Sequence, residues 1–421
     1  MIETSLRLDA QRRLADVGNA DVVVGIPTYK HARTLAPVMK TVAEGLARDF
    51  KGLKTVITVI DGGSPDDTLT VANQLPLPSG VKRLVTSYQG IQGKGSAVRA
   101  IFEIARALRA RVILILEADL QSITSEWVGK LARPILDGHY QLAIPHYTRP
   151  IPDGAMTDLL AYPLTRLLYG ADVRQPMGGE YALSAEFAHR ITTRDVWETD
   201  VARHGLDIWL TTTAINENVK MCQVRLGVKV DDSRELLLSF DPTFVQAIGT
   251  LFRMMDIYKR RWQDSQQART APFFGNGAAP ASTRPWIPSV TSAALGDAFV
   301  AGSRRYVRLW KTALTPSTRN AIRELSEASD GATRFDAKLW ARTVYDFSTV
   351  YNQGEGDPDK IVAALLPLYY ARCATLMRET NMEPAAVERA IQEQARQFAI
   401  EKPYLVHLWN TYVPWAWEGV R

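Results

Sequence analysis

The residues that could do chemistry begin with two acids at the end of an apolar segment. Glu117 and Asp119, separated by Ala118, directly follow the apolar run at residues 112–116. Carboxylates that close a buried strand are costly unless a cation or backbone amides compensate their charge. With Asp119 as a ligand, Mg²⁺ or Mn²⁺ could neutralise charge on a leaving nucleoside diphosphate. The alternative is an exposed turn in which water solvates both acids.

A second polar group follows two other β-branched runs. Pro27, Thr28 and Tyr29 close the first run, and Asp61 closes the next one and opens the loop at residues 61–68. Open α/β sheets bind ligands at the carboxyl ends of their strands, where an Asp can accept hydrogen bonds from a nucleobase or a ribose. The alternative is that the Asp and Ser side chains of this loop only cap the helix that follows.

A glycine-rich loop carries the third candidate group. Residues 90–95 read Gly-Ile-Gln-Gly-Lys-Gly, with Gly93 and Lys94 just ahead of a helical pattern at 98–108. Free amides, the positive end of a helix dipole and a lysine together suit a diphosphate. The spacing is not that of a P-loop, and a surface turn is the alternative.

The elements that must position these groups follow from the hydrophobic pattern. Short β-branched runs, typical of buried parallel strands, stand at residues 22–24, 56–60, 112–116 and 142–144. Apolar residues at helical spacing lie between them, at residues 35–46 and 98–108. Strands that alternate with helices predict a doubly wound α/β sheet.

The rest of the chain has a different character. A chain of 421 residues exceeds what one hydrophobic core usually serves. Strand signals fade from Pro242 onward, where the sequence becomes helical and rich in aromatic residues. We therefore predict an α/β domain at residues 1–240 and a mainly helical module at 241–421. A segment near 263–289, rich in Gly, Ala, Ser and Pro, predicts a flexible connection.

The composition narrows the classes of partner. Fifty basic and 45 acidic side chains give a net charge of +5, spread along the chain, which favours small anionic ligands over nucleic acid. No secretory signal opens the sequence and no apolar run approaches the roughly 18 residues of a membrane span, so we expect a cytoplasmic protein without a transmembrane segment. The oligomeric state is left open, with a homodimer as one alternative.

Taken in order, these motifs resemble the GT-A fold of family-2-like glycosyltransferases, a Rossmann-like fold for nucleotide-diphospho-sugar transferases. In this resemblance Glu117, Ala118 and Asp119 are the DxD motif, with Glu as the first acid. Two later segments, residues 175–180 and 205–207, resemble a narrower group of mannosylglycerate synthase and glucosyl-3-phosphoglycerate synthase.

The resemblance implies a metal-dependent, configuration-retaining transfer of a hexose to D-glycerate or a similar small hydroxy acid, as in compatible-solute synthesis. The hexose, glucose or mannose, would come from a nucleotide sugar such as UDP-glucose or GDP-mannose, and the product would be a glucosylglycerate or a mannosylglycerate. Mg²⁺ or Mn²⁺ would be the cofactor. The implied donor-binding residues are Pro27, Thr28, Tyr29, Asp61, Gly93, Lys94, Glu117 and Ala118; the acceptor-binding residues are Arg149, Thr157, Gly178 and Gly179; the metal ligand is Asp119; and the catalytic residues are Asp207 and Glu180.

Two departures from the family pattern concern the metal and the acceptor. Members often supply a histidine to the metal after the last core strand, but here Asp231 and Asp232 follow that strand. Either could serve as an oxygen ligand, or Asp119 and phosphates alone could hold the metal. Relatives that use phosphoglycerate place an arginine where this chain has Ala155, so free glycerate is favoured. Arg149 is then the candidate for the acceptor carboxylate.

Two alternative functions remain open from the sequence. One is a polyprenyl-phosphate or polysaccharide hexosyltransferase at a membrane surface, which the isoelectric point near 9.0 permits. The other is a non-catalytic nucleotide-sugar-binding protein whose helical module serves as a partner surface. Lipid flotation would reveal the first, and donor binding without turnover would reveal the second.

Overall fold

The computed structural model describes residues 4–151, 153–232, 236–263, 269–275, 290–327 and 335–414, with side chains left out at 236–240. The chain forms two compact units. The first comprises Met1–Arg149, Arg174–Asp232 and Ala271–Thr283, and the second comprises Pro150–Val173, Ser233–Thr270 and Arg284–Arg421. The two compact units therefore differ from the predicted division at residue 240, because the second unit also contains residues 150–173. The predicted flexible segment at 263–289 lies mostly outside the described residues.

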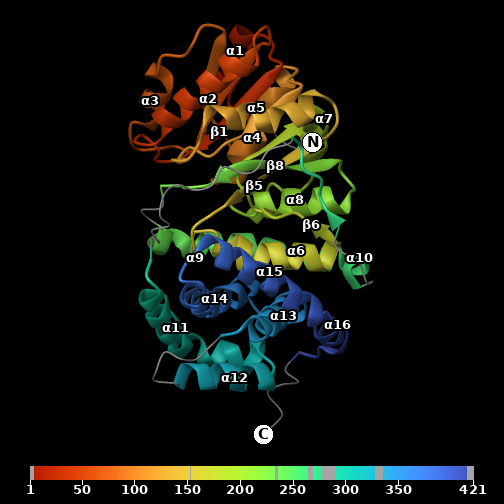
Figure 1. Cartoon of the computed structure of the whole chain (residues 1–421). Coiled ribbons are helices and arrows are strands. Elements are labelled where there is room, and N and C mark those ends of the chain that lie inside the picture. The colour runs from red at the N-terminus through yellow and green to blue at the C-terminus, as the bar shows by residue number, and fades with distance from the viewer. Residues whose placement is uncertain are drawn as a thin grey trace. The chain divides into compact units, whose positions relative to one another are not determined.

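A seven-stranded sheet forms the centre of the first unit (Figure 1). Its strand order is β3-β2-β1-β4-β7-β5-β8. The bounds are β1 Val22–Thr28, β2 Thr55–Asp61, β3 Val81–Ser87, β4 Val112–Ile115, β5 Leu142–Thr148, β7 Tyr181–Ser184 and β8 Met221–Val228. The four predicted strands are present as β1, β2, β4 and β5, and the predicted doubly wound α/β sheet is confirmed.

The direction of the strands determines which chain segments meet at one edge. Strands β1, β2, β3 and β4 are parallel, and β5 is parallel to β8. Strand β7 is antiparallel to both β4 and β5. The carboxyl ends of six strands and the amino end of β7 therefore lie at the same edge. Residues that precede β7 thus join those that follow β4, β5 and β8.

Helices cover both faces of this sheet. The side chains of Val22, Val24 and Ile26 in β1 belong to the core beneath α2 (Leu35–Asp49) and α5 (Ser125–Leu136). On the opposite face, β1 contacts α4 (Lys94–Ala107), which packs in turn against α7 (Ala185–Thr192). Successive side chains of a strand point to opposite faces, so the uninterrupted apolar run of β1 is what a sheet covered on both sides requires. The remaining helices of this unit are α1 Leu8–Val17, α3 Thr68–Gln74, the 3₁₀ helix η2 Asp200–Ala202 and α8 Leu206–Asn216.

The second unit is mainly helical, as predicted for the C-terminal module. Helix α14 packs against α11, α9 and α13, and α15 packs against α6 and α13 (Figure 1). The helices are the π-helix η1 Thr157–Ala161, α6 Tyr162–Tyr169, α9 Leu236–Ile257, α10 Lys259–Gln263, α11 Ser292–Ala313, α12 Pro316–Glu327, α13 Ala337–Gln353, α14 Pro358–Thr380, α15 Pro384–Ile400 and α16 Lys402–Thr411, beside the short strands β6 Ala171–Asp172 and β9 Arg269–Thr270.

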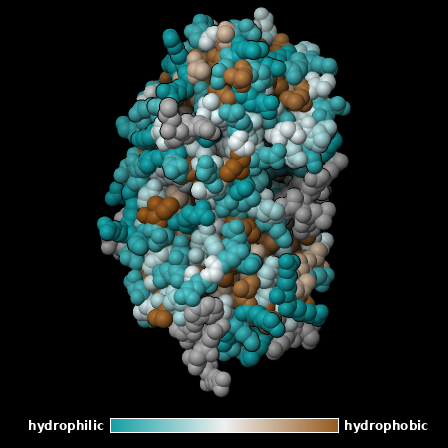
Figure 2. Space-filling model, turned by 180° about the vertical axis from the view of Figure 1, so that it is seen from behind, coloured by the Kyte–Doolittle hydropathy of each residue, from teal (hydrophilic) through white to brown (hydrophobic). Residues whose placement is uncertain are grey.

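One helix bears on the expectation that no segment crosses a membrane. Among the described residues, α14 alone has the length and apolar composition of a membrane span. Of its most apolar window, 78% is buried inside the structure, and a core helix passes the same test, so this is weak evidence for a span. On the face seen in Figure 2, hydrophobic residues are scattered among hydrophilic ones.

Candidate functional site

A chain of alternating charges crosses the sheet edge of the first unit. The Lys94 ammonium lies 2.8 Å from Asp207 and 2.6 Å from Glu117. The other oxygen of Glu117 lies 2.5 Å from the ammonium of Lys229, which in turn lies 2.8 Å from Glu180. Each of these five side chains therefore has an oppositely charged neighbour, and five separate segments of the sequence contribute to this chain of charges.

Lys94 reaches the cluster because its helix begins unusually close to the neighbouring backbone. Lys94 is the first residue of α4, as the predicted glycine-rich loop and helix require. The following Gly95 donates its N–H to the carbonyl of Arg203 at 3.0 Å. A Cβ at Gly95 would lie 1.8 Å from the carbonyl oxygen of Val201, so no larger residue fits. This contact brings the start of α4 to the start of α8, whose first turn contains Asp207.

Glu180 is positioned by the loop ahead of β7 and by a buried tyrosine. Gly179 has φ +88°, a conformation that side chains other than glycine rarely adopt, and its Cβ position is 2.6 Å from Glu117 Oε1. The Tyr147 hydroxyl lies 3.1 Å from Glu180 and also donates to the Gly178 carbonyl. Glu180 is fully buried, so its carboxylate is held between a hydroxyl and an ammonium.

Burial and pairing act differently on the two glutamates. Burial would raise the pKa of Glu117, but the ammonium groups of Lys229 and Lys94 hold it well below the ordinary value. For Glu180, burial and the nearby Glu117 and Asp231 carboxylates raise the pKa well above the ordinary value, against the pull of Lys229. Glu117 thus keeps its negative charge, and Glu180 is the acid of the pair that holds a proton more readily.

Three carboxylates gather beside this chain of charges. Oxygen atoms of Glu117, Asp119 and Asp231 all lie within 4.8 Å of one another. Backbone pairing brings the two aspartates together: Leu120 forms a β-bridge with Asp231, and the Asp232 N–H donates to the Asp119 carbonyl. Asp232 itself forms an ion pair with Arg33. Of the two acids that follow β8, the structure therefore places Asp231 in the acidic group.

The residues present fit a hard divalent cation. Burial, with the Glu117 and Asp231 carboxylates, raises the pKa of Asp119 to about 7 against the opposing effect of Lys229, so a further cation beside it would favour its charged form. Asp231 Oδ1 is buried and has no hydrogen-bond partner among the described residues. Among the described residues of the site, five carboxyl groups meet three cationic side chains, Lys94, Lys229 and Arg149, so acidic groups outnumber basic ones by two. Oxygen ligands of this kind suit Mg²⁺ or Mn²⁺.

The predicted nucleotide side lies at the ends of β1 and β2. Asp61 is buried and accepts hydrogen bonds from the N–H groups of Gly63 and Ser64, both at 2.8 Å, and from Thr28 at 3.2 Å. Residues of its own loop thus satisfy much of the hydrogen-bonding capacity of this carboxylate. Tyr29, by contrast, is 51% exposed, and the Lys30 ammonium lies over its ring, 5.2 Å from the ring centre. Among the other predicted donor residues, Pro27 and Ala118 are buried, and Gly93 immediately precedes α4.

The predicted acceptor residues fall in two places. Arg149 donates to Asp231 at 2.5 Å, and its buried Nε has no hydrogen-bond partner among the described residues. It therefore has a donor available at the edge of the acidic group. Thr157 belongs to the second unit, where it opens η1 and is 4% exposed, and Ala155 is fully buried there. Gly178 and Gly179 lie beside Glu180, as described above.

Part of the chain is similar to known glycosyltransferases. Residues 23–160 match the sequence profile of glycosyl transferase family 2, a stretch that contains Lys94, Glu117 and Asp119. The chain carries a glycosyl transferase family 2 domain. The glucosyl-3-phosphoglycerate synthase of Petrotoga mobilis is similar to it, with 24% identity over 244 residues that cover 53% of this chain and 70% of the relative.

Solved structures of glucosyl-3-phosphoglycerate synthase from Mycobacterium tuberculosis are similar to part of this glycosyltransferase. One, in complex with Mn²⁺, UDP and phosphoglyceric acid, has 25% identity and a TM-score of 0.46 over 57% of this chain and 82% of its own. Another, with Mg²⁺ and UDP, has 25% identity and a TM-score of 0.45 over 60% of this chain and 85% of its own. The predicted GT-A fold class and the predicted glycosyltransferase are confirmed through the family match.

Two residues of the transferase site, Lys229 and Tyr147, are not among those that the sequence motifs predicted. Lys229 is 1% exposed and contacts two carboxylates, yet in the sequence it only marks the place where a family histidine is absent. A lysine directly after the apolar strand β8 was the available signal, because a charge at the end of a buried strand needs partners. Tyr147 was not among the predicted site residues either, since a tyrosine at the end of an apolar strand is typical of core packing.

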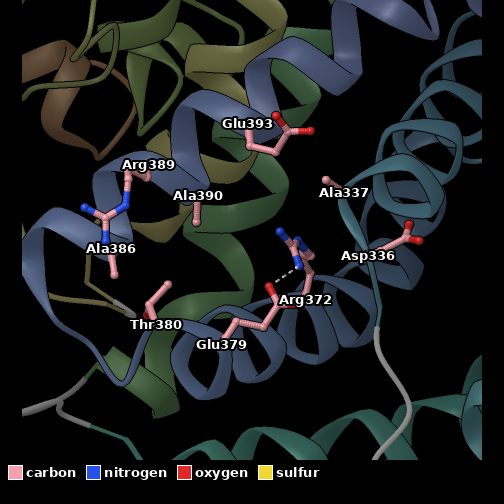
Figure 3. Close-up of a pocket in the computed structure, with 9 residues that line it drawn as sticks. All are labelled: Asp336, Ala337, Arg372, Glu379, Thr380, Ala386, Arg389, Ala390 and Glu393. Atoms are coloured by element: carbon pink, nitrogen blue, oxygen red, sulfur yellow. Dashed lines mark ion pairs between the residues drawn. The ribbon is translucent and has the colours of Figure 1, made fainter.

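The glycosyltransferase also has a pocket in its helical unit, and none of its lining residues is a predicted site residue. It encloses about 400 Å³, and among its lining residues are Arg372, Glu379, Arg389 and Glu393 (Figure 3). Figure 3 shows the ion pair between Arg372 and Glu379, which lie 3.6 Å apart. Arg372 is also bound by Gln394 and by the carbonyl of Phe335, so its charge is already satisfied within the helical packing.

Proposed function

We propose that this glycosyltransferase moves a hexose, glucose or mannose, from a nucleotide-diphosphate sugar to glycerate or a similar small hydroxy acid, with retention of configuration. The observation that carries the proposal is the acidic group of Glu117, Asp119 and Asp231 beside a lysine that opens a helix. A metal and a helix start with a lysine together suit a diphosphate leaving group. The family match and the named activity of the Petrotoga mobilis relative support a sugar donor.

In this proposal the residues of the chain bind and orient the substrates. Lys94 and the first N–H groups of α4 bind the donor diphosphate. Asp119 and Asp231 hold Mg²⁺ or Mn²⁺, which when bound would neutralise charge on the leaving group. Asp207, whose Oδ1 is buried without a hydrogen-bond partner among the described residues, faces the reaction centre through its contact with Lys94. Catalysis then rests on positioning and charge compensation.

The acceptor is the finer part of the proposal. The unpartnered Nε of Arg149 suits one oxygen of an acceptor carboxylate. The relative from Petrotoga mobilis is named for 3-phosphoglycerate, which would add a phosphate that needs its own cation. Ala155, where phosphoglycerate-using relatives place an arginine, offers no charge, so we propose that the unphosphorylated acid is preferred.

A substrate screen tests the proposed function. UDP- and GDP-linked glucose and mannose would each be incubated with D-glycerate and with 3-phosphoglycerate, and products detected by mass spectrometry. We expect a hexosylglycerate that requires Mg²⁺ or Mn²⁺ and disappears with EDTA. The Asp119→Ala variant is the matched negative control. Product from polyprenyl phosphate but from no hydroxy acid, or donor binding without any turnover, would replace the proposal with one of the two alternatives.

A further inference from the structure

The buried lysine at the end of β8 occupies a position among the carboxylates where a cation is expected. The Lys229 ammonium lies 2.5 Å from Glu117, 2.8 Å from Glu180 and 3.1 Å from the Gly178 carbonyl. It also lies 3.7 Å from Asp231 Oδ1. With 1% of the side chain exposed, this charge cannot turn away into water. Lys229 is therefore a permanent positive charge inside the acidic group.

This lysine limits the oxygens that remain for a metal ion. Glu117 has both oxygens bound to ammonium groups, one to Lys94 and one to Lys229. Asp231 has one oxygen bound to Arg149, which leaves its Oδ1. Together with Asp119, the free protein thus offers carboxylate oxygens from two residues. Mg²⁺ prefers six oxygen ligands and holds its water molecules tightly. Carboxylate oxygens from only two residues therefore bind it weakly.

We infer that Lys229 is a built-in counter-cation that prevents tight metal binding to the free enzyme and makes metal binding depend on the nucleoside diphosphate. The inference rests on the proposed function, because it takes the diphosphate as the source of the missing oxygens. The like charge of Lys229, close to Asp231, repels a divalent ion in the empty site. Diphosphate oxygens add ligands and negative charge, and they draw the Lys94 ammonium toward themselves.

A purely structural lysine would behave differently when removed. If Lys229 only held Glu117 and Glu180 in place, Lys229→Met would disorder the acidic group and weaken metal binding. If Lys229 competes with the metal, the same change frees one Glu117 oxygen and removes a repulsive charge. Metal binding without nucleotide then becomes stronger, although turnover falls because Glu180 loses its partner. The direction of the change in metal affinity separates the two roles.

The test measures Mn²⁺ binding by electron paramagnetic resonance, with and without UDP or GDP, in the full chain. We expect weak binding to the wild type alone and much tighter binding with nucleotide. In Lys229→Met, nucleotide-free affinity should rise by at least about tenfold. Lys229→Arg keeps the charge and should behave as the wild type. Lys220→Met, which removes an exposed lysine at the opposite end of β8, should change nothing.

A double variant keeps the test decisive if Lys229→Met unfolds. Lys229→Met with Glu180→Gln removes one charge of each sign and should fold, and it still frees the Glu117 oxygen, so nucleotide-free affinity should again rise. Tight Mn²⁺ binding to the wild type without nucleotide, or no gain in a folded variant, overturns the inference and leaves the proposed function standing. Absence of Mn²⁺ binding to the wild type even with UDP and GDP overturns the metal site of the proposed function, and the inference with it.

Discussion

At the scale of single residues, neighbours in the sequence can have unrelated partners. Asp231 joins Glu117 and Asp119, whereas the adjacent Asp232 forms an ion pair with Arg33. Successive residues in extended backbone point to opposite sides, so only one of the pair can face the acidic group. The chemistry of this site therefore depends on which side each acid occupies, and single substitutions can separate the two.

Asparagine substitutions at these adjacent acids should have different effects. Asp231→Asn removes a carboxylate that faces the cation site and should weaken Mn²⁺ binding in the presence of UDP by about 10- to 100-fold, with a parallel loss of turnover. Asp232→Asn should retain both within about twofold, because Asp232 pairs with Arg33 and does not belong to the acidic group. Titration of each variant with Mn²⁺ gives the comparison. Equal losses in the two variants would contradict the assignment of Asp231.

The raised pKa of Asp119 predicts how metal binding varies with pH. An acid whose pKa rises from 3.8 to about 7 on folding favours the folded state below 3.8, and that contribution is lost as the pH rises to 7. A cation binds only the carboxylate form, so metal affinity should rise about tenfold per pH unit below 7 and level off above it. Mn²⁺ titrations with UDP across this range measure the slope. Asp119→Asn should lose this dependence on pH. A wild-type affinity that does not vary with pH would refute a competition between the Asp119 proton and the metal.

Arg149 should matter for the acceptor more than for the donor. Loss of a charge-assisted contact to the acceptor carboxylate should cost about 2 to 3 kcal/mol, which is roughly a 30- to 150-fold fall in kcat/KM for glycerate. The measurement compares Arg149→Ala with the wild type at saturating donor. Arg149→Lys keeps a charge beside Asp231 and serves as the control for metal binding. Unchanged glycerate kinetics in Arg149→Ala, or a preference for 3-phosphoglycerate in the wild type, would show that the acceptor assignment is wrong.

At the scale of elements, the site depends on one antiparallel strand in a sheet that is otherwise parallel. Strand β7 is four residues long and inserts between β4 and β5, so the residues ahead of it reach the edge where those strands end. Glu180 immediately precedes this strand, and Gly178 and Gly179 lie next to it. The close approach of this loop to Glu117 leaves no room for a side chain at Gly179 without a shift of the glutamate.

An alanine at Gly179 should damage the site through crowding as well as backbone strain. The positive φ alone should cost about 1 to 2 kcal/mol, and the new Cβ would also push Glu117 from its two lysines. Gly80→Ala is the matched control, since Gly80 has φ +90° and no atom within 4 Å of its Cβ position. We expect both variants to lose stability in chemical unfolding, Gly179→Ala more than Gly80→Ala, and a loss of turnover only in Gly179→Ala. Full turnover in folded Gly179→Ala would contradict the close packing of this loop.

At the scale of the whole molecule, the two units have different kinds of buried charge. In the first unit the charges surround the candidate site. In the second, Asp346 is fully buried and accepts hydrogen bonds from Tyr404 at 2.5 Å and from the N–H and hydroxyl of Thr315 at 2.8 and 3.0 Å. These contacts join α13, α16 and the residues ahead of α12. This carboxylate therefore has a structural role within the helical unit.

Replacement of Asp346 by asparagine should reduce stability and leave the chemistry intact. The NH₂ group of an asparagine would face at least one of the N–H or O–H groups that now donate to the carboxylate. The loss of that hydrogen bond should lower the free energy of unfolding by roughly 2 to 3 kcal/mol. Urea unfolding measures this loss, and kcat at a temperature where the variant is folded measures the chemistry. The exposed Asp256→Asn is a surface control. Reduced kcat without reduced stability would place Asp346 in the functional machinery.

The sequence by itself determined the elements and the order of the site motifs. Short β-branched runs and helical periodicity are local patterns, so β1, β2, β4 and β5 could be predicted with the acids and glycines that follow them. The strand β7 could not, since its four residues, unlike the four of β4, include no β-branched side chain, and its direction depends on its neighbours. The predicted boundary at residue 240 likewise missed that residues 150–173 pack with the helical unit.

Only the tertiary structure decided which charges compensate one another. Lys229 is 112 residues from Glu117 and 49 from Glu180 in the sequence, and no local spacing relates them. A buried charge is stable only beside its partners, and those partners come together only when separate strands end at one edge. The tertiary structure also decides that Asp231, and not Asp232, faces the acidic group. This choice depends on the backbone pairing of these residues with Asp119 and Leu120. Sequence pattern thus specified the chemical groups, while strand order and direction specified their pairing.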